Sequence, residues 1–202
     1  MAGNIRKILS KEELERKSGR NKKIIVIVIG IILVLSTAGY LFTELTGTKT
    51  KPLVFNGIKF AKTEYGSWSF AYGGNNYETA FNPGDTANIS GKITKRMSDY
   101  YGALLYLSAQ PIEDFSQAAS QEILRNIGGL ISRSNPACLD ENCSQDYPPK
   151  NCSGDNIIVF KESKTNSSSL SENNKCVILE YSPGEEEMVA DAFLFRIMDI
   201  EK

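Results

Sequence analysis

The sequence of 202 residues contains no histidine. This absence excludes Ser-His-Asp and Cys-His catalysis, and it excludes zinc or iron sites that use histidine ligands. The sequence also has no Ser-x-x-Lys dyad, no Gly-x-Ser-x-Gly elbow and no glycine-rich phosphate loop. Adjacent acids occur at Glu113-Asp114 and Asp140-Glu141, but neighbours on a helix point apart and two acids in a loop are usually solvated. A glycosidase pair drawn from distant positions remains open.

An excess of basic residues is missing from most of the chain. Residues 43–202 carry 23 − 8 = 15 lysines and arginines against 24 − 3 = 21 acids, which gives a charge of −6. A net-negative region without a stripe of cations binds phosphate backbones poorly, so no nucleic-acid partner is expected. No motif indicates a cofactor, and none is predicted.

A long uncharged run is present at residues 24–42. A helix of this length spans ~28 Å, close to the ~30 Å hydrocarbon core of a bilayer, so the run predicts a transmembrane helix with the lipid bilayer as partner. Residues 1–23 carry eight cations against three acids, and basic flanks stay in the cytoplasm. We therefore predict a single-pass protein of the cell membrane, with a cytoplasmic N-terminus, a stalk at 43–52 and an extracytoplasmic domain at 53–202.

A cleaved signal peptide is the alternative interpretation of the same run. Small residues at Ser36 and Ala38 fit a peptidase site after Ala38, and Ile24 to Leu35 would then form the apolar region. The long basic segment and the continuation of the run to Phe42 favour the anchor. Under both interpretations the C-terminal domain lies outside the cytoplasm.

The sequence has four cysteines, all in the predicted outer domain, where oxidising conditions allow disulfides to persist. We predict two disulfides, and of the three possible pairings we favour Cys138–Cys143 and Cys152–Cys176. A zinc site with four thiolate ligands is the alternative, but it would usually show two Cys-x-x-Cys pairs. No metal is predicted.

Four Asn-x-Ser/Thr sequons also lie in the outer domain, which is a mild excess over chance. Two of them precede a cysteine, where crowding would block a glycan, and Asn166 is the most accessible. The possible glycosylation sites are Asn88, Asn142, Asn151 and Asn166.

Hydrophobic periodicity predicts an α+β fold, with one mixed sheet and two helices packed on it. Asn56-Gly57 predicts a tight hairpin, because both residues accept the positive φ of a type I′ turn. The alternating Trp68, Phe70 and Tyr72 form either a carbohydrate or peptide platform or, as we favour, the core face of the sheet. The remaining predicted elements are strands at 77–81, 103–108, 130–134 and 156–160, the last in a hairpin with 176–181, and helices starting at Pro111 and Glu185, with 163–174 as a loop.

A set of short motifs follows one another along the sequence. They are the uncharged run, Phe55 to Phe60, Trp68, Tyr77, Phe81 to Pro83, the cysteine loop, Ile157 to Phe160, Asn174 to Glu180 and a terminal helix. This layout resembles an uncharacterised group of archaeal single-pass membrane proteins with a cysteine-containing outer domain. The resemblance covers most of residues 24–200, although its motifs are short, and it implies a location and a fold pattern but no activity. The acidic residues that usually follow the Phe-x-Pro element of the group are replaced here by Gly84-Asp85-Thr86.

The leading functional hypothesis is a non-catalytic interaction module at the cell surface, whose partner is another membrane or envelope protein. An envelope hydrolase or a thiol oxidoreductase is the alternative, although Cys138-x4-Cys143 is a poor copy of a redox Cys-x-x-Cys motif. A pocket that joins Glu180 or Asp155 to a second acid would favour the hydrolase. A deep pocket with converging Asp, Glu, Lys or Tyr side chains would favour an enzyme in general. A flat or grooved exposed apolar patch would favour the interaction module.

Overall fold

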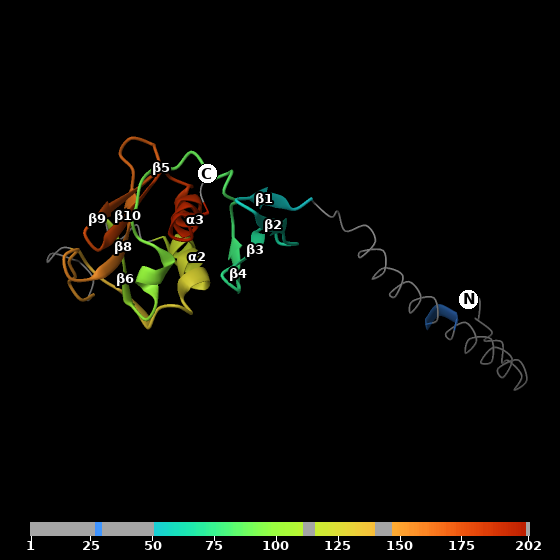
Figure 1. Cartoon of the computed structure of the whole chain (residues 1–202), viewed down its shortest axis with the longest axis horizontal. Coiled ribbons are helices and arrows are strands. Elements are labelled where there is room, and N and C mark those ends of the chain that lie inside the picture. The colour runs from blue at the N-terminus through green and yellow to red at the C-terminus, as the bar shows by residue number, and fades with distance from the viewer. Residues whose placement is uncertain (1–26, 30–50, 111–115, 140–146, 201–202) are drawn as a thin grey trace, which may run out of the picture. The chain divides into compact units, whose positions relative to one another are not determined.

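The computed structural model describes residues 27–29, 51–110, 116–139 and 147–200, and is drawn in Figure 1. The chain divides into two units, Met1–Lys49 and Thr50–Lys202. In the first unit, the described residues Ile27, Val28 and Ile29 are helical and exposed.

The predicted transmembrane helix is not found, and this part of the predicted fold class is wrong. No helix within the described ranges is long and apolar enough to cross a membrane. In the described part of the second unit, the α-helices α2 (Gln117–Ile127) and α3 (Glu186–Ile197) have 11 and 12 residues. At ~1.5 Å per residue neither helix reaches the ~30 Å that a span requires. Most of residues 24–42 lie outside the described part of the chain.

The first sheet is an antiparallel meander of four strands, in the order β1-β2-β3-β4. The predicted hairpin is confirmed, since Asn56 and Gly57 have φ of 47° and 80° and Phe55 pairs with Ile58. A second tight turn, at Gly73-Gly74, also has positive φ at both residues, and it starts the fourth strand at Asn75 rather than at Tyr77. The strands are β1 (Leu53–Phe55), β2 (Ile58–Lys62), β3 (Trp68–Tyr72) and β4 (Asn75–Thr79).

The second sheet has six strands in the order β5-β9-β10-β8-β6-β7. The β9–β10 pair is antiparallel, and the other four pairs are parallel. The short β5 lies so close to β9 that only glycine fits at position 91. A Cβ atom there would be 1.8 Å from the backbone oxygen of Leu170. The strands are β5 (Ser90–Gly91), β6 (Leu104–Gln110), β7 (Arg133–Pro136), β8 (Asn156–Glu162), β9 (Ser169–Asn173) and β10 (Cys176–Tyr181).

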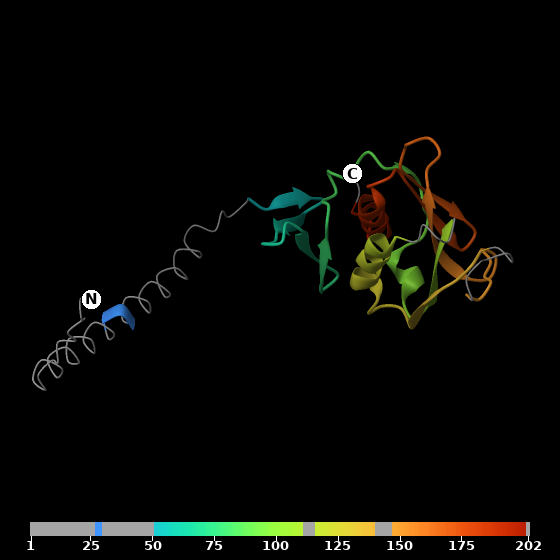
Figure 2. The ribbon, with the colours of Figure 1, turned by 180° about the vertical axis from the view of Figure 1, so that it is seen from behind.

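Helices α2 and α3 form a layer between the two sheets (Figures 1 and 2). The Phe195 ring of α3 lies 5.9 Å from the rings of both Phe60 and Phe70, which come from the meander. On its other side α3 contacts β9 and β10. This position explains why α3 is buried all round from Val189 to Ile197, rather than along one face.

The middle strands of the six-stranded sheet are buried on both faces. In β8, Ile158 and Phe160 join the main core with the helices, whereas Ile157 and Val159 point into a second cluster on the opposite face. The residues Ala137 and Cys138 are buried over that face, and Cys152 packs against it. Burial on both faces explains the continuous apolar run from 157 to 160, which is typical of parallel strands.

Three further details of the predicted fold are corrected by the strand pairing. The protein has two sheets rather than one mixed sheet. Strand β10 pairs with β8 in parallel, so 156–160 and 176–181 do not form a hairpin. The hairpin partner of β10 is β9, which lies inside the predicted loop 163–174 and turns at Asn174, with φ of 53°. Strand β9 escaped prediction because Leu170 is its only apolar residue.

Candidate functional site

An open pocket of about 380 Å³ lies where the turn of the meander meets the end of α3. We call it the tyrosine cleft. Tyr72 ends β3, Tyr77 lies in β4, and Tyr101 follows the short 3-10 helix η1 (Met97–Tyr100). Beyond the C-terminal end of α3, Asp199 completes the wall with φ of 58°. The residues that line the cleft are Tyr72, Gly73, Asn75, Tyr77, Arg96, Met97, Ser98, Tyr101, Ile197 and Asp199.

The tyrosines and charges of this cleft differ in their access to water. Tyr101 is 60% exposed. Burial raises the pKa of Tyr77, and a hydrogen bond from Asn75 partly opposes this by lowering it. The neighbouring Tyr101 and Tyr72 raise the same pKa further. The guanidinium of Arg96 and the carboxylate of Asp199 lie 3.9 Å apart, and both side chains are largely exposed. The cleft thus offers aromatic surface and hydrogen-bonding groups, with weakly paired charges that a ligand could engage.

Two smaller hollows adjoin this region. A hollow of about 200 Å³ shares Arg96 and Asp199 with the tyrosine cleft and adds Lys92 and Arg196. A third pocket, of about 240 Å³, lies between Phe55, Phe195 and the turn at 83–87. The guanidinium of Arg196 lines both of these hollows and donates hydrogen bonds to the carbonyl oxygens of Ile89 and Ser90.

A pair of acids, Glu122 of α2 and Asp191 of α3, is buried on the face of the helix layer that meets β4. Their residues are 4% and 0% exposed. One oxygen of Asp191 accepts a hydrogen bond from the backbone N–H of Phe81 at 2.8 Å, just after β4. Burial, together with the neighbouring Glu122, raises the pKa of Asp191 well above its ordinary value. Glu122 forms an ion pair with Arg125 one turn further along α2.

Asn126 connects the same helix to the edge of the meander. Its side-chain oxygen accepts a hydrogen bond from the N–H of Glu78 at 3.0 Å, and its side-chain nitrogen donates to the carbonyl of Glu78 at 2.8 Å. The amide therefore pairs with both backbone groups of one β4 residue, as a neighbouring strand would. The same nitrogen also donates to the carboxylate of Glu122 at 3.5 Å, which links this contact with β4 to the buried acids.

The buried acids do not form an open catalytic pair, because neither carboxyl group is accessible to a substrate. The acids singled out in the sequence do not converge either. Glu180 forms an ion pair with Lys161 at 2.6 Å, and Asp155 pairs with Lys150 at 3.5 Å. The adjacent acids at 113–114 and 140–141 lie outside the described residues. In the residues that the structure describes, no cluster of three or more cysteines and acids could hold a metal ion.

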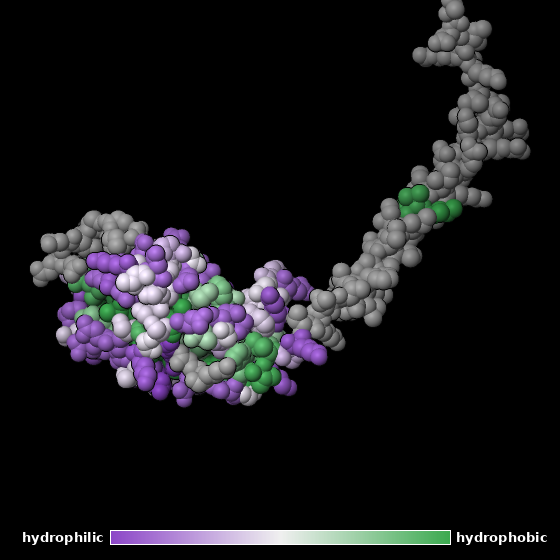
Figure 3. All heavy atoms as spheres, turned by 90° about the horizontal axis from the view of Figure 1, so that it is seen from above, coloured by the Kyte–Doolittle hydropathy of each residue, from purple (hydrophilic) through white to green (hydrophobic). Residues whose placement is uncertain are grey.

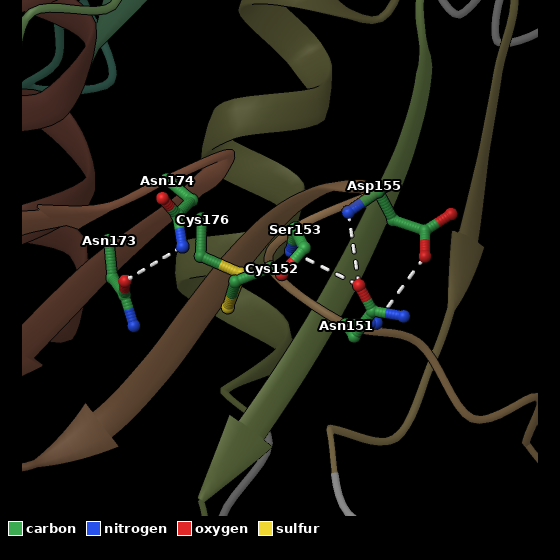
Figure 4. Close-up of a disulfide and its surroundings, with 8 residues drawn as sticks. Asn151, Cys152, Ser153, Asp155, Asn173, Asn174 and Cys176 are labelled. Atoms are coloured by element: carbon green, nitrogen blue, oxygen red, sulfur yellow. Dashed lines mark hydrogen bonds between the residues drawn. A yellow bond between two sulfur atoms is a disulfide. The ribbon is translucent and has the colours of Figure 1, made fainter.

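The predicted disulfide Cys152–Cys176 is confirmed (Figure 4). It joins the start of β10 to the segment before β8, with the two Cα atoms 5.0 Å apart. The N–H of Lys175 also donates to the carbonyl of Cys152 at 2.9 Å, which aligns the two segments. Cys138 is buried and disulfide-bonded, while Cys143 lies outside the described part. The bond at Cys152 and Cys176 removes two of the four thiolates that a zinc site would have required.

Three of the predicted glycosylation sites fall in the described part of the chain. Asn88 and Asn166 are exposed and lie in turns. Asn151 is also exposed, but its side-chain oxygen accepts a hydrogen bond from the N–H of Ser153 (Figure 4) and another from the N–H of Gly154. Asn142 lies outside the described residues. Glycosylation remains a prediction at all four positions.

Hydrophilic residues predominate on the face of the domain that Figure 3 shows. The large hydrophobic residues that are exposed in the second unit are distributed over separate elements rather than gathered in one segment. They are Val54, Tyr65, Tyr101, Leu104 and Tyr147. Single exposed residues of this kind are normal for a protein surface, so the tyrosine cleft is a better candidate for binding than an apolar patch.

Sequence reasoning predicted the Cys152–Cys176 disulfide but missed the cleft and the buried acids. It assigned Trp68, Phe70 and Tyr72 to a core face, and the stacking of Phe70 on Tyr77 at 5.6 Å agrees with this. A signal for the acid pair was present, since Asp191 interrupts the otherwise apolar stretch from Val189 to Leu194. The cleft gave no comparable signal, because its walls come from three separate parts of the chain.

Comparison with known proteins adds no relative, since no family model, no curated protein and no solved structure matches this chain.

Proposed function

We propose that this chain is a non-catalytic interaction module that acts outside the cytoplasm, where it binds another membrane or envelope protein through the tyrosine cleft. The observation that carries the proposal is the composition of that cleft. Tyrosine and arginine are enriched among the residues that dominate binding at protein interfaces, and serine, glycine and asparagine supply adaptable hydrogen bonds in binding loops. All five residue types line the cleft, and its tyrosine Tyr101 and its arginine Arg96 are both exposed.

The disulfide supports the location. Disulfides form and persist in oxidising compartments, and Cys152–Cys176 anchors a segment that contributes to the second hydrophobic cluster. A thiol oxidoreductase would need an accessible, reactive cysteine pair, whereas Cys176 is fully buried.

The test begins with site-specific photocrosslinking of the full chain in the cells that make it. A crosslinker placed at Tyr101 should capture one reproducible envelope protein, whereas the same crosslinker at Tyr65 should not. Tyr65 is a suitable control because it is also a tyrosine, is 93% exposed and does not line the cleft.

The captured protein is then purified, and its affinity for variants of the full chain is measured by calorimetry. Tyr101→Ala and Arg96→Ala should each weaken binding by about tenfold or more, as expected for interface hot spots, and Tyr65→Ala should leave it unchanged. Equal capture from positions 65 and 101, or hydrolytic activity in a substrate screen without any captured protein, would contradict the proposal.

A further inference from the structure

We propose that Asp191 keeps a proton at neutral pH and donates it to Glu122, so that one shared proton clamps the meander onto helices α2 and α3. The inference is independent of what the tyrosine cleft binds. It concerns the seam where the chain leaves β4, next to the two helices.

The first argument is the hydrogen bonding of Asp191. One of its carboxyl oxygens accepts from the N–H of Phe81, while the other is fully buried and has no hydrogen-bond partner. A buried polar atom without a partner costs about 1–3 kcal/mol, so native proteins rarely retain one. The neighbouring acceptor is the carboxylate of Glu122, and two carboxylates cannot bond without a hydrogen between them. A proton on Asp191 provides the missing partner.

The second argument is the charge balance around the pair. The groups that face Asp191 are Glu122 and Arg125 from α2 and the N–H of Phe81 from the chain after β4. Arg125 forms its ion pair with Glu122, so one cation serves two acids. Two carboxylates in one buried site cannot both ionise at low cost, and the group with less compensation keeps its proton. That group is Asp191, whose pKa is raised by burial and by Glu122.

The third argument is the position of the pair in the fold. Asp191 bonds to the chain just after β4, and Glu122 lies next to Asn126, which bonds to both backbone groups of Glu78 within β4. Helix α2 therefore bonds to β4, and α3 bonds to the chain just after it. Loss of the proton would place two like charges between the helices and the chain after β4. The packing of the meander on the helices would then be less stable. We expect β4, as the strand nearest the charges, to loosen first.

The sign of the pH dependence follows from linkage. Because the folded state holds the proton more tightly than the unfolded state, this contribution is complete below the ordinary pKa of aspartate. It is lost as pH rises through the raised pKa of the folded protein. The protein should therefore lose stability on going from mildly acidic to alkaline conditions.

The experiment measures urea unfolding of the full chain and of Asp191→Asn between about pH 5 and about pH 9. Asparagine resembles the protonated acid, because its oxygen can accept from Phe81 and its nitrogen can donate to Glu122. The fluorescence of Trp68, the single tryptophan, reports on the meander. Wild type should become less stable as pH rises. Between the ordinary pKa of aspartate and the raised pKa of Asp191, the unfolding constant should increase by about tenfold for each pH unit. Asp191→Asn should lose that slope and exceed wild type at alkaline pH.

Asp199→Asn is the matched control, since it makes the same chemical change at an exposed site and asparagine tolerates the positive φ there. It should keep the wild-type slope. Infrared spectroscopy of the wild type supplies a direct measurement that does not depend on whether a variant folds. A protonated carboxyl band should be present at neutral pH and disappear at alkaline pH. Absence of that band at neutral pH, or an Asp191→Asn slope equal to wild type, would overturn the proposal.

Discussion

The meander and the six-stranded sheet pack on the same two helices, but their strands are connected in different ways. Every strand of the meander pairs with its neighbour in the sequence through a short connection. The six-stranded sheet has four parallel pairs, and parallel strands require a crossover between them. Its middle strands are buried on both faces, whereas the meander buries one face and leaves Val54 and Lys59 exposed on the other.

This difference indicates where the domain is most easily opened. The meander can form from local contacts, and the side chains that join it to the helices include Phe195, Asn126 and Asp191. The six-stranded sheet depends on contacts between distant parts of the chain, on a disulfide and on two hydrophobic clusters. We therefore expect the meander to detach before the six-stranded sheet unfolds, as a local opening unit.

The largest expected effect is that of Phe195→Ala. The change leaves a cavity between α3 and the rings of Phe60 and Phe70, and the truncation of a buried phenylalanine costs about 3–5 kcal/mol. Urea unfolding should be followed by Trp68 fluorescence for the meander and by circular dichroism for the whole domain. The fluorescence transition should move to lower urea than the circular dichroism transition.

Val54→Ala is the control for this comparison, because Val54 lies in the same meander but is 56% exposed. Its effect should stay within about 0.5 kcal/mol. If both probes shift equally in Phe195→Ala, the meander and the six-stranded sheet unfold as one unit, and the proposed contrast between them is lost.

The next effect concerns the six-stranded sheet. The double variant Cys152→Ala, Cys176→Ala removes a crosslink with a sequence separation of 24, and the free energy of unfolding should fall by about 3 kcal/mol. Thermal unfolding monitored by circular dichroism measures the loss. Ser153→Ala is the matched neighbour, since the backbone N–H of Ser153 makes the hydrogen bond to Asn151. A double variant as stable as Ser153→Ala would show that the crosslink contributes little.

The smallest effect is that of Glu180→Gln in β10. The hydrogen bond from Lys161 lowers the pKa of Glu180, so this contribution is present above the ordinary glutamate range and is lost as pH falls through the lowered value. Because the pair is partly exposed, the contribution should be below about 1 kcal/mol. Melting temperatures between about pH 3 and about pH 6 should decline less steeply in Glu180→Gln than in wild type. This pH dependence is opposite in sign to that expected at Asp191. The same decline of melting temperature in Glu180→Gln and wild type would refute the expected contribution of Glu180.

The meander was the more predictable half because its determinants are local. Asn56-Gly57 specifies a two-residue turn by its tolerance of positive φ, and the alternation of Trp68, Phe70 and Tyr72 indicates the buried face. The disulfide Cys152–Cys176 was also predicted. The last helix was predicted near its observed start, although its burial on all sides was not.

The remainder depends on contacts that no local pattern encodes. Strand β9 looks like a polar loop, and it becomes a strand because β10 and β5 lie beside it. Strand β10 lies between β9 and β8, antiparallel to the first and parallel to the second, so the two apolar runs were wrongly paired as a hairpin. Glu122 and Asp191 meet because α2 packs on α3, which the sequence around neither residue indicates.

The disulfide also turns part of the chain into a closed ring. Residues 152–176 contain the whole of β8 and β9 and the exposed turn at 164–167. A protease that cuts in this turn opens the ring at one point, yet the two fragments remain covalently joined through Cys152 and Cys176. The protein would then migrate as one species without a reducing agent and as two with it, and a cut in this exposed turn would release no fragment.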